Sequence, residues 1–156
     1  MAHPVIPRGA ALAAFLCCTA CAAGDEGEIG GRIEFPGEGV PAMTLVLLER
    51  NDPVPRRVPI AAGQERYSLR VAPGTYTVFA IPEERPDPLL VGAHTSYSVC
   101  NARQRVGGEA DGTCRTGPPR EVEVTAGARI EDADIDDWYL EESVASALLA
   151  LAGSGE

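Results

Sequence analysis

The sequence predicts an all-β protein, a β-sandwich of seven to eight short strands, from two observations. From residue 29 onward, short segments rich in Val, Ile, Leu, Tyr and Thr alternate with turns rich in Pro, Gly and Asp. The chain has 156 residues with 17 glycines and 13 prolines, and this length fits a single domain. Seven or eight strands within about 115 residues make a sandwich the expected architecture.

Eight extended segments are expected. They cover residues 30–35, 43–49, 58–60, 66–71, 75–81, 89–99, 120–124 and 128–135. The segment 43–49 is a continuous apolar run, which suits a strand at the centre of a sandwich. The segment 58–60 contains Pro59 and is expected at an edge, because proline cannot donate to a sheet ladder.

The clearest pattern lies between residues 66 and 81. Apolar and polar residues alternate on both sides of Pro73-Gly74, with Tyr67 and Val71 before it and Tyr76 and Val78 after it. Pro-Gly favours a tight reversal. The two runs are therefore predicted to form a β-hairpin.

These residues carry a resemblance to a known family. Residues 30–37, Gly-Gly-Arg-Ile-Glu-Phe-Pro-Gly, and residues 67–80, Tyr-Ser-Leu-Arg-Val-Ala-Pro-Gly-Thr-Tyr-Thr-Val-Phe-Ala, resemble the carboxypeptidase regulatory-like domains. The resemblance covers about residues 29–140 and implies a transthyretin-like (prealbumin-like) sandwich of seven strands. It implies no peptidase activity, because the catalytic zinc domain of carboxypeptidases is a separate module.

The N-terminus resembles the signal of a bacterial lipoprotein. Residues 1–20 contain an apolar run of roughly ten residues, about half of what a membrane-spanning helix needs. Cys21 follows Thr-Ala, which fits a lipobox, so Cys21 is expected to carry the lipid. The alternative is ordinary signal-peptidase cleavage after Ala20 or Ala23, which releases an exported soluble product.

The expected organisation has four parts. Residues 1–20 are the signal, 21–28 a lipidated flexible tether, 29–140 the sandwich, and 141–156 a helical or disordered tail. In the tail, Val144, Leu148 and Leu151 fall at helical spacing. The tail is expected either to dock on the sandwich or to stay loose. The expected location is the cell envelope, with the lipid in the outer membrane if the cell has one. The expected partners are that membrane and an unidentified envelope protein or glycan.

Charge and composition exclude several functions. The formal net charge is −10, and it becomes −11 once residues 1–20 are removed with their one arginine. Nucleic-acid binding is not expected, because Lys and Arg supply most of that affinity. The chain has no lysine, which excludes Schiff-base chemistry, a P-loop and a lysine isopeptide crosslink.

Two cysteines remain after the signal and Cys21 are set aside, namely Cys100 and Cys114. In an exported domain such a pair most simply forms a disulfide, and closing a loop of about fifteen residues contributes about 3 kcal/mol. A metal site is the alternative, but the pair supplies only two ligands. Arg103 and Arg105, within the enclosed loop, are interpreted as solvated loop charges.

Candidate catalytic residues are few. His94 is the only histidine of the mature chain, and Ser96 and Ser98 lie beside it. Neighbouring positions in one strand do not build a catalytic triad, and no G-x-S-x-G motif is present. The sequence therefore predicts a non-catalytic protein without a cofactor, with His94 as a structural residue.

The acidic run 131–137 is the strongest candidate site. In a strand, Asp132, Asp134 and Asp136 would share one face with about 7 Å between successive positions, an arrangement that could supply oxygen ligands to calcium. Alternatively these aspartates face water. Trp138 either closes the end of the sandwich or, with Tyr139, stacks on a sugar. The predicted function is a structural or binding module of the envelope, and the alternative is a carbohydrate- or calcium-binding module.

Overall fold

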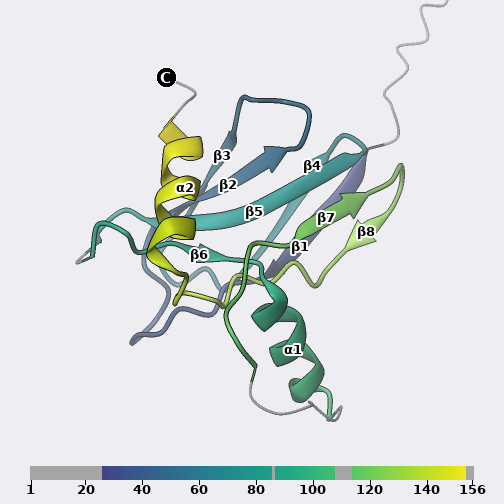
Figure 1. The fold of residues 1–156 in the computed structure, drawn as a ribbon. Helices are drawn as coiled ribbons and strands as arrows, with labels where there is room; N and C mark the ends of the chain where they lie inside the picture. Colours follow the sequence, from purple (N-terminus) through teal and green to yellow (C-terminus); the bar gives the residue numbers. More distant parts are fainter. Residues whose placement is uncertain (1–25, 86, 108–113, 154–156) are drawn as a thin grey trace, which may run out of the picture.

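The protein is described by a computed structural model over residues 26–85, 87–107 and 114–153. Within these ranges, ten elements follow one another (Figure 1). They are β1 (Gly27–Arg32), β2 (Met43–Glu49), β3 (Arg56–Ile60), β4 (Arg66–Val71), β5 (Gly74–Pro82), β6 (Gly92–Ala93), α1 (Ser96–Arg105), β7 (Glu121–Val124), β8 (Arg129–Ile130) and α2 (Glu142–Gly153).

The strands form two sheets, which confirms the predicted all-β sandwich. The smaller sheet has the order β4-β1-β8, with β4 antiparallel and β8 parallel to β1. The larger sheet has the order β3-β2-β5-β6, and β7 also pairs with β5. As predicted, the proline-containing strand β3 lies at an edge.

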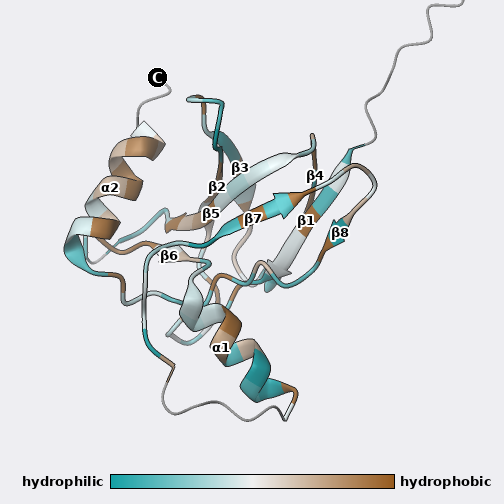
Figure 2. Cartoon of the chain, turned by 45° about the vertical axis from the view of Figure 1, so that its right-hand side comes forward, coloured by the Kyte–Doolittle hydropathy of each residue, from teal (hydrophilic) through white to brown (hydrophobic). Residues whose placement is uncertain are grey.

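The main hydrophobic core lies between the two sheets. Ile29 of β1, Leu45 of β2 and Val78 of β5 are fully buried there. A second core lies on the other face of the larger sheet, where α2 packs against Val46 and Phe79 (Figures 1 and 2). Strands β2 and β5 are therefore buried on both faces, which explains the continuous apolar run of β2.

Helix α2 contributes a third layer to the fold. Leu148 and Ala152 are buried against the larger sheet, and Figure 2 shows hydrophobic residues along much of the helix. The Arg57 side chain of β3 donates to the carbonyl oxygen of Ala152 and so satisfies an acceptor at the helix end. The C-terminal segment is thus a docked helix over its described residues.

The predicted hairpin between residues 66 and 81 is wrong. Strand β4 pairs with β1 in the smaller sheet, whereas β5 lies in the larger sheet, so the chain crosses between sheets after Val71. The two linking residues are Ala72 and Pro73. Hairpin turns of types I′ and II′ require a positive φ at the first linking residue, which alanine rarely adopts, and the ring of Pro73 fixes its φ near −65°.

The predicted extended segment 89–99 is also wrong in its second half. Only Gly92–Ala93 forms a strand, and helix α1 begins at Ser96. Tyr97 and Val99 favour a strand, but the helix is nucleated by its cap. The side chain of Thr95 accepts from the backbone N–H of Tyr97 at 3.0 Å.

Strands β1 and β8 also differ from the prediction in their bounds. Strand β1 begins at Gly27, inside the segment expected to be a tether. Strand β8 covers only Arg129–Ile130, after which Ile135 forms an isolated bridge with Ile33. The acidic run is consequently an irregular segment rather than a strand.

Candidate functional site

The predicted site residues lie where α1 meets the segment 133–139. Thr95 caps α1, and the Ser98 hydroxyl accepts from the Thr95 N–H at 3.1 Å, which completes a capping box. Thr95 and Ser98 are both buried. The helix therefore starts at a fixed point beside the acidic run. Asn101 and Arg105 are four residues apart, so both lie on the side of the helix that contacts this run.

Asp134 is bound by two donors from different elements. Its Oδ2 lies 2.7 Å from Nη2 of Arg105, and its Oδ1 accepts from the backbone N–H of Arg32 at 2.8 Å. The Asp134 side chain is 7% exposed and that of Arg105 is 26% exposed. Arg105 also donates to Glu34, so one guanidinium serves two carboxylates.

Asp136 is more deeply buried, with a side chain that is 2% exposed. Its Oδ2 accepts from the amide of Asn101 at 2.8 Å and lies 3.8 Å from Nη2 of Arg105. Its Oδ1 has no hydrogen-bond partner within the described residues. A buried carboxylate oxygen without a donor lowers stability. The charge of Asp136 is therefore compensated mainly by Asn101 and Arg105.

Asp137 is held by hydroxyl groups instead of a cation. Its Oδ2 accepts from Thr95 at 2.7 Å and from Thr116 at 2.8 Å. Its Oδ1 accepts from the backbone N–H of Tyr139 at 3.3 Å, and its backbone carbonyl accepts from Ala93 at 3.0 Å. Asp137 therefore connects β6, the start of α1 and the segment after Cys114.

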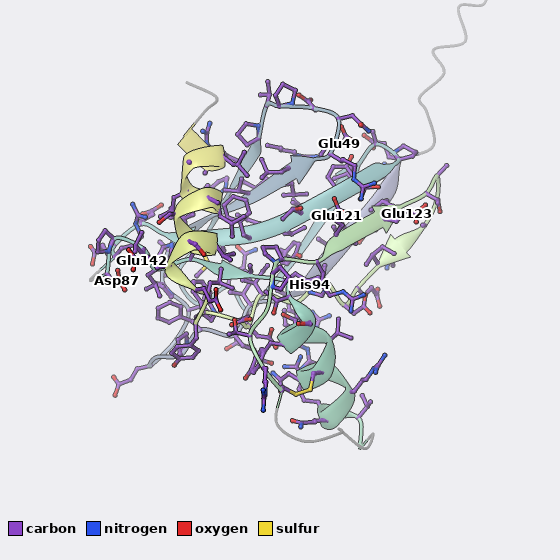
Figure 3. All side chains as sticks on the ribbon, in the orientation of Figure 1. Glu49, Asp87, His94, Glu121, Glu123 and Glu142 are labelled. Carbon is purple, nitrogen blue, oxygen red and sulfur yellow. A yellow bond between two sulfur atoms is a disulfide. The ribbon has the colours of Figure 1, made fainter. Side chains whose placement is uncertain are left out.

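His94 directly follows β6 (Figure 3). It contacts the acidic network, which is the set of Asp134, Asp136 and Asp137 with their donors. Its Nδ1 lies 3.1 Å from the backbone carbonyl of Asp134. A carbonyl only accepts, so Nδ1 carries the proton of the neutral ring. Burial lowers the pKa of His94 below its ordinary value of 6.5, although the carboxylates of Asp132, Asp134 and Asp136 act in the opposite direction. The ring is thus a neutral donor with its Nδ1 engaged.

The disulfide predicted between Cys100 and Cys114 is present, with a Cα–Cα distance of 5.6 Å (Figure 3). It joins the middle of α1 to the segment that carries Thr116. Both ends of the bridge therefore lead to the acidic network, through Asn101 on one side and Thr116 on the other.

Trp138 is buried, at 5% exposure. Its indole N–H donates to the carbonyl of Glu34 at 2.7 Å, and Phe35 packs against it edge to face with ring centroids 4.9 Å apart. A Cβ added to Gly92 would lie 2.5 Å from the Trp138 ring. These contacts place Trp138 in the core at the end of the sandwich, while Tyr139 next to it is 74% exposed.

The structure does not bring the three predicted calcium ligands together. Asp132 is exposed, whereas Asp134 and Asp136 converge on Arg105. Within the described ranges, no three His, Cys, Asp or Glu side chains are placed to hold a metal ion.

Sequence reasoning missed the partners of these aspartates. Arg105 was expected to be a solvated loop charge, and it is instead the cation of the network. The available signal was the helical spacing of Asn101 and Arg105, which a predicted strand ending at residue 99 concealed. Thr95, three residues before Ser98, was the second signal, because this spacing is typical of a helix cap.

The described contacts bind α1 and the segment 133–139 to each other. Cys21 and the signal lie outside the described residues, and neither described helix is long and apolar enough to cross a membrane.

Comparisons with known proteins add one structural neighbour. No family model matches the chain, and no curated protein does. A crystal structure of a DUF3823 family protein from Bacteroides ovatus aligns with 70% of this chain and 44% of that chain, at 13% sequence identity and a TM-score of 0.34. The chain thus spans less than half the length of that protein.

Proposed function

We propose that this protein is an exported, lipid-anchored module that acts as a non-catalytic structural or binding component of the bacterial cell envelope. The lipid on Cys21 would hold the sandwich near the membrane, which is the outer membrane in a cell that has two. The sandwich would be of the carboxypeptidase regulatory-like type, a proposal that rests on the motifs at residues 30–37 and 67–80.

The single observation that carries the export proposal is the Cys100–Cys114 disulfide. Disulfides persist in oxidising compartments and are rare in the cytosol. The signal-like sequence before Cys21 supports the same location independently. Together they favour an envelope protein over a cytosolic one.

The contacts of the reactive side chains support a non-catalytic role. Nδ1 of His94 is engaged by a backbone carbonyl, so no carboxylate orients the ring as in a catalytic triad. The Ser98 hydroxyl belongs to the helix cap. The calcium alternative has no favouring observation, because Asp134 and Asp136 already share Arg105.

Mass spectrometry and fractionation of the natively expressed protein test the anchor. We expect a lipid on Cys21 and membrane association of the intact chain. The C21A variant should lose both, whereas the matched C18A variant should keep both. An unmodified N-terminus at Ala22 or later, or membrane association of C21A, would contradict the proposal.

A further inference from the structure

A cavity of about 490 Å³ lies between the end of β1, the loop that follows it and the start of β4. Its size is within the range of small-molecule sites in proteins, about 300–1,000 Å³. Arg32 and Arg66 line it together with Phe35, Glu34 and Glu65. The cavity adjoins the acidic network through Glu34 and through the backbone N–H of Arg32, but Asp134 and Asp136 do not line it.

Two arginines face each other across the ladder between β1 and β4. Arg32 of β1 and Arg66 of β4 are directly opposite each other in the antiparallel ladder. Such residues have Cβ atoms about 5 Å apart, and like charges at this position are destabilising. Both side chains are exposed, and neither has an ion pair or hydrogen bond with another described residue.

The contrast with neighbouring arginines makes this pair informative. Arg70 on β4 and Arg129 on β8 belong to the same sheet, and each has a carboxylate partner, in Glu26 and Glu28 respectively. In a chain of net charge −10, two adjacent arginines without a carboxylate partner are unexpected. An external anion would supply the missing partner, because guanidinium groups match the geometry of a carboxylate.

An aromatic ring lines the same cavity as the two arginines. Phe35 is half-buried and lines the cavity, and its ring is fixed by the edge-to-face contact with Trp138. A fixed ring next to a cation pair suits a ligand with one negative charge and one apolar ring face. Glu34 and Glu65 add carboxylate oxygens that can accept hydrogen bonds from hydroxyl groups.

We propose that this cavity binds an acidic sugar residue of a polysaccharide, a hexuronate, with the carboxylate between Arg32 and Arg66 and the sugar ring against Phe35. The proposal deepens the proposed binding role in the envelope and rests on it. A densely charged polyphosphate is less suited, since the acidic protein repels it, whereas a uronate carries one charge per ring.

Calorimetric titration of the mature chain, with its disulfide intact, tests the site. The probes are a galacturonate oligosaccharide, a neutral galactose oligosaccharide of equal length, inorganic phosphate and a polyglutamate peptide. We expect the galacturonate to bind at least about tenfold more tightly than each of the others, which corresponds to one charge-assisted pair. No binding of galacturonate, equal binding of the neutral sugar, or tighter binding of phosphate or peptide would overturn the proposal.

Three variants locate the site. R32Q and R66Q should each weaken galacturonate binding about tenfold, whereas the control R70Q, on the same strand as Arg66 but outside the cavity, should bind within about twofold of the wild type. R66Q should melt no lower than the wild type without ligand, because it relieves a like-charge contact. Equal losses in R66Q and R70Q would overturn the assignment. Because the anchor is assayed separately, failed sugar binding with an intact lipid on Cys21 would reject this inference alone.

Discussion

Nη2 of Arg105 lies 2.7 Å from Oδ2 of Asp134 and 3.8 Å from Oδ2 of Asp136, so one guanidinium at the end of α1 faces two buried carboxylates. The first of these carboxylates, Asp134, lies 29 residues further along the chain than Arg105. The burial of Asp134 and Asp136 is tolerated because this cation and a few hydrogen-bond donors compensate for lost hydration. Contacts of α1 therefore compensate for the burial of these carboxylates in the segment after β8.

Replacing Arg105 should reveal this dependence. Arg105→Met keeps the length of the side chain and removes the charge, and we expect the free energy of unfolding to fall by about 2 kcal/mol, measured by urea titration. Arg103→Met, in the same helical turn and exposed, is the control and should change stability by less than about 0.5 kcal/mol. Equal effects of the two substitutions would contradict a special role for Arg105.

Removal of the disulfide should destabilise the contact between α1 and the acidic network as well. The Cys100→Ser, Cys114→Ser double variant releases a covalent link across 14 residues, and we expect a loss of about 3 kcal/mol in the free energy of unfolding. Non-reduced wild-type protein should show no free thiol at these positions. A reductant should lower the melting temperature of the wild type and leave that of the double variant unchanged.

The sequence pattern located strands well wherever burial alone determined them. Strand β2 covers the residues predicted for it, because a strand buried on both faces is recognisable from a continuous apolar run. The pairing of β4 and β5 was mispredicted, because the alternation at Tyr67 and Tyr76 is the same whether the two strands share a sheet or face each other. Only the chemistry of Ala72-Pro73 distinguishes these two cases.

The sequence pattern did not predict helix α1 or the acidic network, and the reason is different. Tyr97 and Val99 have strand propensity, and the helix is stabilised by tertiary contacts of Asn101 and Arg105 with residues more than 25 positions away. Such contacts become visible only after the chain is folded. The disulfide was predictable because cysteine number and compartment determine it, whatever the local secondary structure.

Gly92 is a specific test of packing at the end of the sandwich. Gly92→Ala would place a methyl group 2.5 Å from the Trp138 ring, and we expect a loss of about 1–3 kcal/mol in the free energy of unfolding. Trp138 is the only tryptophan, so a shift in the emission maximum of the folded state reports its displacement. Gly153→Ala, where an added Cβ meets no atom beyond its own helix within 4 Å, should not lower the free energy of unfolding and should leave the emission maximum unchanged.

The burial of His94 predicts a pH dependence of stability. Because the folded state lowers the pKa of His94 below 6.5, the unfolded chain binds a proton that the folded chain does not bind between the lowered pKa and 6.5. Stability should therefore be independent of this group above pH 6.5 and fall as the pH decreases through that interval. The slope reaches at most about 1.4 kcal/mol per pH unit for one proton.

The variant His94→Asn isolates this contribution, because an asparagine amide can still donate to the carbonyl of Asp134 and does not titrate. We expect the stability difference between wild type and variant to shift against the wild type from pH 7.5 to pH 5.5 in urea titrations. Carboxylates such as Asp132 and Asp136 are present in both proteins, so their titration largely cancels in the difference. A difference that stays constant between the two pH values would mean that His94 takes up a proton as easily in the folded protein as in the unfolded chain, contrary to its burial beside Asp134.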